Sequence, residues 1–272
     1  MSDLTPEDTG RPFAVVTGAS SGIGRELAAQ FAEHGYDVLI TAEEAAIALA
    51  ADDLQQRYAV TVIPVRADLA SYDGVEQLWG AIVATGRDVE AIALNAGRGI
   101  GGDFVRETRL EDEQNVIDVN VTSTVHLAKR VLPDMVARGR GRVLFTSSIA
   151  SMMPGTYQAV YNASKSFVQS FAEALRAELK DTGVTVTSLM PGPTETNFFD
   201  RAEMLDTRVG ASDHKDDAAQ VAKQGFEALM KGEEKVVAGS LMTKAQAATS
   251  KVLPDRAKAA MHSKMAEPGS AE

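Results

Sequence analysis

The segment Thr17-Gly18-Ala19-Ser20-Ser21-Gly22-Ile23-Gly24 decides the fold of this chain. It follows an apolar run at 13–17 and precedes a segment of helical periodicity at 23–34, so it predicts a strand, a glycine-rich turn and a helix in succession. Glycines there would let backbone N–H groups approach a pair of phosphates, which the positive end of the helix dipole would help to hold. The spacing, G-x-x-x-G-x-G, differs from the common fingerprint G-x-G-x-x-G. Taken alone, the turn is also compatible with an ordinary glycine turn in which Ser20 or Ser21 lies near the helix N-cap.

Strand and helix patterns alternate along nearly the whole chain. Short apolar runs, typical of strands in a parallel sheet, predict strands at 13–17, 37–41, 61–66, 91–95, 142–147, 184–190 and, more weakly, 235–238. The segments between them have helical periodicity at 23–34, 43–58, 72–85, 110–138, 159–182 and 216–230. This alternation predicts an α/β fold with a doubly wound, Rossmann-type parallel sheet of about seven strands. The ligand crevice of such a sheet lies at the carboxyl ends of its strands.

No Pro/Gly/Ser-rich linker interrupts the alternation, so we expect a single catalytic domain at 13–240, preceded by a flexible segment at 1–12. The segment at 193–213 has no clear periodicity and follows a strand, which predicts a substrate loop above the crevice. Residues 241–272 are expected to form a C-terminal extension. It looks helical at 241–265 and reads as a frayed end at 267–272.

Composition excludes several classes of protein. The 272 residues include 27 Lys and Arg against 38 Asp and Glu, a formal charge of −11, which argues against a nucleic-acid binder. The chain has no Cys, so disulfides, Cys-zinc sites and thiol nucleophiles are ruled out. The four His are scattered, and we predict no metal site. Because no stretch approaches 18 uninterrupted apolar residues and the N-terminus has no apolar leader, we expect a soluble cytoplasmic protein without membrane contact.

Tyr161 and Lys165 lie four residues apart at the start of a predicted helix, so their side chains share one face. A nearby ammonium stabilises a phenolate and would bring the pKa of Tyr161 toward neutrality, which makes the pair suitable for acid–base chemistry. Taken alone, the pair favours a half-buried aromatic beside a solvated Lys, because Tyr and Lys occur at this spacing by chance in many helices. Ser148 follows the strand predicted at 142–147, at the crevice end of the sheet, and favours the catalytic interpretation.

With these motifs the chain resembles the short-chain dehydrogenase/reductase family, over roughly 13–237. The matching motifs occur in the family's order: the glycine turn with Gly18, Ser20, Ser21, Gly22, Ile23 and Gly24, the pair Asp68-Leu69, the motif Asn95-Ala96-Gly97, the tetrad Asn120, Ser148, Tyr161 and Lys165, and the segment Pro191-Gly192 with Thr194 and Thr196. Joint coincidence of motifs in the right structural context is very improbable.

The resemblance implies hydride transfer between a nicotinamide cofactor and a carbonyl or alcohol carbon. It assigns Tyr161 as the acid or base, Ser148 as a hydrogen-bond donor to the reacting oxygen, and Lys165 as the partner of Tyr161 and of the nicotinamide ribose. Asn120 would hold a water that links Lys165 to solvent. It implies that Asp68-Leu69 contacts the adenine, and that the Pro191-Gly192 segment lies beside the nicotinamide.

The choice between NAD and NADP depends on the end of the second predicted strand, Thr41-Ala42-Glu43-Glu44. A carboxylate at Glu43 would repel a ribose 2′-phosphate, which gives a slight preference for NAD. The alternative is NADP, with Arg66 or the hydroxyls of Ser20 and Ser21 at the phosphate. Glu43 and Glu44 are also what the first turn of a helix favours.

Apolar side chains in the loops around the crevice predict a largely apolar substrate. They are Ile100, Phe104, Met152, Met153, Phe198, Phe199, Met204 and Leu205. The helices at 110–138 and 159–182 match those that the family uses for an isologous interface, which implies a homo-oligomer, a dimer or a tetramer. The alternative function is a catalytically silent nucleotide-sensing or scaffold protein of the same fold. The intact tetrad favours the enzyme, because a sensor does not need these four side chains together.

Overall fold

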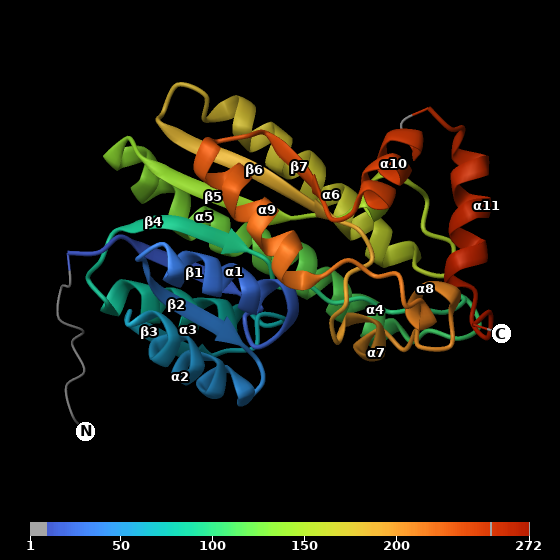
Figure 1. The fold of residues 1–272 in the computed structure, drawn as a ribbon, viewed down its shortest axis with the longest axis horizontal. Coiled ribbons are helices and arrows are strands. Elements are labelled where there is room, and N and C mark those ends of the chain that lie inside the picture. The colour runs from blue at the N-terminus through green and yellow to red at the C-terminus, as the bar shows by residue number, and fades with distance from the viewer. Residues whose placement is uncertain (1–9, 251, 272) are drawn as a thin grey trace.

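Seven parallel strands in the order β3-β2-β1-β4-β5-β6-β7 form the centre of the computed structural model, which describes residues 10–250 and 252–271 (Figure 1). The strands are β1 (Phe13–Thr17), β2 (Asp37–Ala42), β3 (Val62–Arg66), β4 (Val89–Leu94), β5 (Gly141–Thr146), β6 (Val184–Pro191) and β7 (Lys235–Ala238). The direction of winding reverses between β1 and β4, so a crevice opens there at the carboxyl ends of the strands. The predicted fold class and all seven strands are confirmed.

Helices cover both faces of the sheet (Figure 1). One face carries α1 (Gly22–Glu33), α2 (Ala46–Tyr58) and α9 (Ala218–Lys231). The other carries α3 (Tyr72–Ala84), α5 (Ser123–Arg138) and α6 (Ala159–Glu178), with α4 (Leu110–Ile117) packed against α6. A group of shorter helices gathers beyond the carboxyl ends of the strands: α7 (Phe198–Arg201), α8 (Arg208–Ala211), α10 (Leu241–Ser250) and α11 (Asp255–Ala266).

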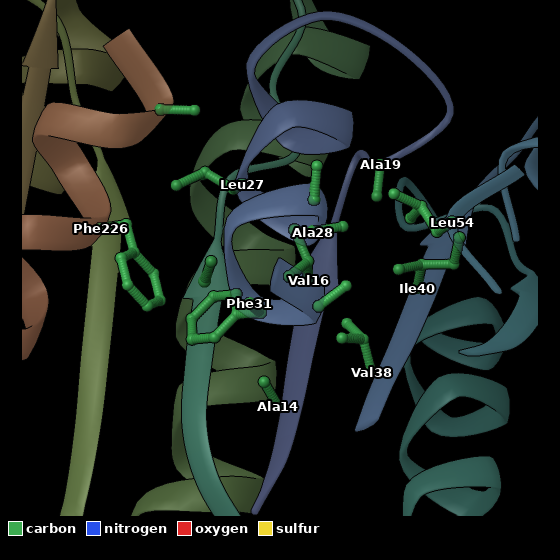
Figure 2. Close-up of a cluster of buried hydrophobic side chains, with 14 of the residues drawn as sticks. Ala14, Val16, Ala19, Leu27, Ala28, Phe31, Val38, Ile40, Leu54 and Phe226 are labelled. Carbon is green, nitrogen blue, oxygen red and sulfur yellow. The ribbon is translucent and has the colours of Figure 1, made fainter. Parts of the chain in front are cut away.

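The hydrophobic core explains why the sheet is nearly continuous in apolar residues. All five residues of β1 are buried, because helices pack on both faces of this central strand. On the face of α1, the side chains of Val16, Leu27, Phe31 and Ile40 form one cluster with Phe226 from α9 (Figure 2). The rings of Phe31 and Phe226 meet edge to face, with centroids 5.2 Å apart. Each such buried side chain stabilises the fold by about 1.5–3 kcal/mol.

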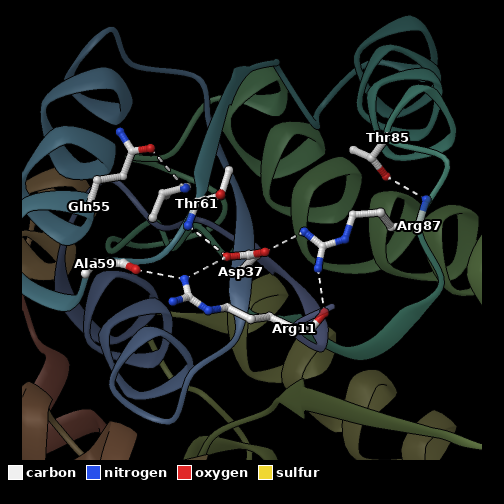
Figure 3. Close-up of polar contacts among 8 residues, drawn as sticks. Arg11, Asp37, Gln55, Ala59, Thr61, Thr85 and Arg87 are labelled. Carbon is white, nitrogen blue, oxygen red and sulfur yellow. Dashed lines mark hydrogen bonds and ion pairs between the residues drawn. The ribbon is translucent and has the colours of Figure 1, made fainter. Parts of the chain in front are cut away.

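A buried carboxylate fastens the opposite end of the sheet, at the amino end of β2. Asp37 is completely buried, and its two oxygens accept hydrogen bonds from Arg87 Nη1 at 2.7 Å and from the Thr61 backbone N–H at 2.8 Å (Figure 3). Arg87 also donates to the Arg11 carbonyl at 2.6 Å, and the Arg11 guanidinium lies 3.7 Å from the Asp37 carboxylate. This network joins the segments that lead into β1, β3 and β4.

The structure corrects three details of the sequence analysis. The helix expected at 110–138 is divided into α4 and α5 by a π-helical turn at Asp118–Thr122. The helical tail expected at 241–265 consists of two separate helices. Of the end expected to fray at 267–272, the described residues 267–271 instead dock on the rest of the chain, since the Ala271 N–H donates to the Asp206 carbonyl at 2.9 Å. Much of the flexible segment expected at 1–12 lies outside the described residues.

Candidate active site

The glycines of the turn between β1 and α1 pack closely against the backbone around them. Gly18 has φ +67°, and a Cβ there would lie 2.8 Å from the Ala96 Cα, while a Cβ at Gly24 would collide with the Gly18 carbonyl oxygen. Ser21 occupies the N-cap of α1 but its side chain makes no capping hydrogen bond, so it does not compete for the N–H groups of the first turn. The turn therefore fits a diphosphate better than the ordinary capped turn that the sequence left open.

Asn95 joins the carboxyl ends of three strands beside this turn. Its Nδ2 donates to the Thr17 carbonyl at 3.1 Å, and its Oδ1 accepts from Thr146 Oγ1 at 3.0 Å. Thr17 Oγ1 in turn accepts from the N–H groups of Asn95 and Ala96, each at 2.9 Å. The ends of β1, β4 and β5 are thus held in one arrangement by side chains of the Asn95-Ala96-Gly97 motif and its neighbours.

Asn120 lies in the π-helical turn between α4 and α5 and is almost completely buried. Its Oδ1 accepts from the Arg98 N–H at 2.8 Å, while Nδ2 donates to the Arg98 carbonyl at 2.9 Å and to Ser164 Oγ at 2.8 Å. Short π segments are frequent at functional sites because they redirect a side chain without ending the helix. Here the side chain fixes the backbone that follows Gly97.

Ser148, Tyr161 and Lys165 converge where β5 meets α6. Ser148 Oγ accepts from the Ala150 N–H at 3.1 Å and donates to the Pro191 carbonyl at 3.4 Å. Lys165 is almost completely buried. Its Nζ donates to the Thr146 carbonyl at 2.9 Å and lies 5.9 Å from the centroid of the Tyr161 ring. The three side chains expected from the sequence therefore occupy one site.

Burial dominates the proton affinities at this site. Desolvation raises the pKa of Tyr161 to about 12, despite the opposing hydrogen bond with Ser148, and lowers the pKa of Lys165 to about 8. The expectation that Lys165 brings the pKa of Tyr161 toward neutrality is wrong for this structure. The ammonium bonds to the Thr146 carbonyl instead of the phenol, and both groups lose the water that would stabilise their charged forms.

These side chains open onto a cavity of about 470 Å³ at the carboxyl ends of the strands. Every catalytic and cofactor-binding residue expected from the sequence lines it except Asn120, which lies behind Arg98. The cavity is large enough for a small molecule and a cofactor portion to meet at Tyr161.

The comparisons with known proteins agree with this site. The model of the short chain dehydrogenase family matches residues 12–204. The chain belongs to this family. It is therefore an NAD(P)-dependent oxidoreductase that acts on carbonyl and alcohol groups, and no observation supports the catalytically silent alternative.

Three individual proteins show how similar this dehydrogenase is to known proteins. It is 35% identical to sulfoacetaldehyde reductase 2 of Chromohalobacter salexigens over 190 residues, which is 68% of this chain and 74% of that protein. A short-chain dehydrogenase from Sphingobium yanoikuyae in complex with NADPH has a TM-score of 0.77 and 26% identity, covering 83% of this chain and 87% of its own. One from Burkholderia phymatum in complex with NAD also has a TM-score of 0.77 and 26% identity, covering 89% and 92%.

Beside the carboxyl end of β2 the dehydrogenase carries two adjacent carboxylates at the cavity. Glu43 is exposed on the rim, and its carbonyl accepts from Arg66 Nε at 2.9 Å. Glu44 accepts from Ser20 Oγ at 2.9 Å and pairs with Arg201 of α7 at 2.6 Å. Sequence analysis missed Arg201, because nothing local in the 193–213 loop indicates that it reaches the end of β2.

At the substrate end, only three of the eight expected apolar residues line the cavity: Met153, Phe198 and Phe199. Phe104 and Leu205 are more than half exposed and lie elsewhere. Residues of the tail that sequence analysis did not assign to the site also line the cavity, namely Gln246, His262, Met265 and Ala266. The tail reaches the cavity because α11 packs on α8 and on the cluster of Phe199, Ala202 and Met204.

Within 10–250 and 252–271, no helix has both the length and the apolar composition needed to cross a bilayer. Over the same residues, no group of three or more His, Cys, Asp or Glu side chains is placed to hold a metal ion.

Proposed function

We propose that this dehydrogenase interconverts a ketone or 3-oxoacyl carbonyl and the corresponding secondary alcohol, and that its substrate is largely apolar. The observation that carries the proposal is the convergence of Ser148, Tyr161 and Lys165 on a cavity that also contains the glycine turn. Similarity to a sulfoacetaldehyde reductase supports carbonyl reduction as the class of reaction. Met153, Phe198 and Phe199 give the substrate side its apolar character.

Tyr161 is the proton donor for reduction. Because burial raises its pKa to about 12, the phenol is protonated at neutral pH and can give its proton to the carbonyl oxygen. When bound, the nicotinamide supplies or accepts the hydride. The Ser148 hydroxyl lines the same cavity as Tyr161, so it can donate to the same carbonyl oxygen and stabilise the negative charge that develops there.

Lys165 holds the cofactor's ribose beside Tyr161. An ammonium has three N–H donors, and the bond to the Thr146 carbonyl uses one of them, so two stay available for ribose hydroxyls. Its lowered pKa of about 8 leaves it mostly charged at pH 7. Asn120 acts as a positioning residue, because its Nδ2 donates both protons, to the Arg98 carbonyl and to Ser164 Oγ, and its Oδ1 accepts from the Arg98 N–H. Oδ1 keeps a second lone pair, to which a water beside Lys165 could donate.

For the cofactor, the proposal is a preference for NAD. Glu43 lies on the rim of the adenosine end, and the charge of Arg201 is already balanced by Glu44. The rim carries a second carboxylate in Glu44, and Arg66 is exposed outside the cavity and bonded to the Glu43 carbonyl. A 2′-phosphate would therefore meet negative charge at this end, whereas a 2′-hydroxyl could donate to a carboxylate.

The proposal includes a cytoplasmic homo-oligomer. An apolar groove on the outer side of α4 and α6 is lined by Phe104, Ile117, Val121 and Phe167, among others. Three of these side chains, Phe104, Ile117 and Phe167, are more than 40% exposed. Burial of this groove against a second copy of the chain would remove it from water. Light scattering should give a mass of at least twice the 28.9 kDa of one chain, and a monomeric mass would reject the assembly.

A screen of ketones and secondary alcohols, followed by nicotinamide absorbance with each cofactor, tests the function. We expect turnover of ketones with an apolar body, and faster turnover with NADH than with NADPH. Binding of either cofactor without turnover of any carbonyl or alcohol would contradict the proposal.

A further inference from the structure

The tail of the chain closes the substrate side of the cavity through one anchored helix. Thr156, in the loop that precedes α6, is bonded to α11 twice. Its Oγ1 donates to the Ala259 carbonyl at 3.2 Å, and its own carbonyl lies 2.8 Å from His262 Nδ1. Because Thr156 is only five positions before Tyr161, these bonds fix α11 relative to the catalytic helix. His262 lines the same cavity as Tyr161 and is 5% exposed.

The bond to Thr156 determines the state of the His262 ring. A carbonyl can only accept, so the proton of the imidazole must be on Nδ1. Burial lowers the pKa of His262, which keeps the ring neutral and leaves Nε2 as an acceptor. Within the described part of the chain Nε2 has no hydrogen-bond partner. It is not sealed from solvent, so a ligand can reach it.

An acceptor held in place on the wall of the cavity favours a ligand that brings a donor to it. Met265 and Ala266 follow on the same helix and also line the cavity, and they offer no side-chain donor. Leaving a desolvated acceptor unmatched costs free energy, so a substrate with a donor at this position binds better than one without.

We propose that His262 selects substrates that carry a hydroxyl group, at a position separate from the reacting carbonyl, which donates a hydrogen bond to Nε2. The inference rests on the proposed carbonyl reduction and adds a substrate class to it: an apolar body with the carbonyl at Tyr161 and a hydroxyl at His262.

Two substitutions test the roles of Nδ1 and Nε2 of His262 one at a time. In His262→Asn the amide N–H takes the place of Nδ1, so the bond to Thr156 is kept and the acceptor in the cavity is lost. In His262→Gln the side-chain oxygen reaches the place of Nε2, so the acceptor is kept. The probes are a homologous series of methyl ketones and the same ketones with a terminal hydroxyl. The readout is the ratio of kcat/KM for each hydroxylated ketone to that for its plain counterpart, with the thermal midpoint of each variant as a check on folding.

The unmodified enzyme should favour the hydroxylated ketone at one chain length by about tenfold, as expected for one hydrogen bond. His262→Asn should abolish that ratio while keeping its thermal midpoint, and His262→Gln should retain most of it. Equal kcat/KM values for both ketones at every length, or a ratio preserved in His262→Asn, would overturn the role of His262 and leave carbonyl reduction standing. Absence of turnover with every ketone and alcohol would instead refute the proposed function, and the role of His262 with it.

Discussion

The cofactor half of the cleft is held by the sheet itself, whereas the substrate half is held by segments that lie far apart in sequence. In the first, Asn95 and Thr17 bond the neighbouring strand ends to each other. In the second, the Gly101 N–H donates to the Ala202 carbonyl at 2.8 Å, and buried Asp216 accepts from Thr243 Oγ1 at 2.5 Å. The cofactor half therefore shares the stability of the main core. The substrate half has only a small core of its own, around Phe199 and Met204.

The largest expected effect lies where the two halves meet. Tyr161→Phe removes only the hydroxyl that gives or takes the proton, so kcat should fall by about 10² to 10⁴-fold. Both ligands should still bind, because the glycine turn and the substrate wall are unchanged. Steady-state kinetics and a cofactor titration by fluorescence measure the two quantities. A Phe variant with near-normal turnover would remove Tyr161 from the mechanism.

The pH dependence of ketone reduction and of alcohol oxidation tests whether burial raises the pKa of Tyr161. Because the pKa of Tyr161 is raised to about 12, the phenol stays protonated from pH 6 to 9, and reduction needs that form. At saturating cofactor, so that loss of the Lys165 charge near its pKa of about 8 does not limit ribose binding, we expect kcat/KM for ketone reduction to change little over this range. Oxidation needs the phenolate, whose fraction rises about tenfold with each pH unit below the pKa, so kcat/KM for alcohol oxidation should rise accordingly. A reduction rate that falls tenfold per unit while oxidation stays level would place the pKa of Tyr161 below neutrality.

Asp37 tests whether the cofactor half depends on the whole sheet. Asp37→Asn leaves the Arg87 guanidinium, which is 8% exposed, without its buried carboxylate, and breaking such a pair costs about 3 kcal/mol of unfolding free energy. Urea denaturation should show this loss as a lower midpoint. Asp53→Asn is the matched control, because the Arg25–Asp53 pair is partly exposed on both sides and should contribute far less to the free energy of unfolding. Equal losses of unfolding free energy in the two variants would show that the buried Arg87–Asp37 pair contributes no more than the exposed Arg25–Asp53 pair.

Glu43 tests the adenosine end of the cofactor half. Reversing its charge in Glu43→Arg should shift the ratio of kcat/KM for NAD over NADP toward NADP by about one to two decades. Glu44 is the comparison, since Glu44→Gln breaks the pair with Arg201 and frees a cation at the same end. Titration of both cofactors against both variants measures the shifts. An unchanged ratio in Glu43→Arg would show that Glu43 does not contact the ribose.

The smallest expected effect tests whether the cofactor half and the substrate half of the cleft are independent of each other. Deleting residues 254–272 removes α11 and the bonds of the tail to Asp206, but it leaves Asn95, Thr17 and the glycine turn intact. We expect kcat/KM for ketones to fall by about tenfold through KM, because part of the substrate wall is lost. The dissociation constant of the cofactor should change less than twofold. A cofactor affinity that falls together with substrate affinity would show that the two halves are one cooperative unit.

Sequence by itself determined the sheet, the glycine turn and the positions of Ser148, Tyr161 and Lys165, because each depends on a local pattern of residues a few positions apart. Apolar runs place the strands, and the carboxyl ends of parallel strands meet at one edge of a sheet whatever the loops do. The pKa of Tyr161 could not be read this way, since it depends on how much water the assembled fold removes from the ring.

Only the tertiary structure decided what faces the substrate. A solitary His in a polar helix, such as His262, shows nothing in the sequence that distinguishes it from a surface residue. It becomes part of the cavity because the Thr156 carbonyl, 106 positions earlier, accepts a hydrogen bond from its Nδ1. Arg201 and Glu44 likewise meet only after the 193–213 loop folds back over the end of β2. Such contacts join segments distant along the chain, and their geometry is set by packing, which no local periodicity encodes.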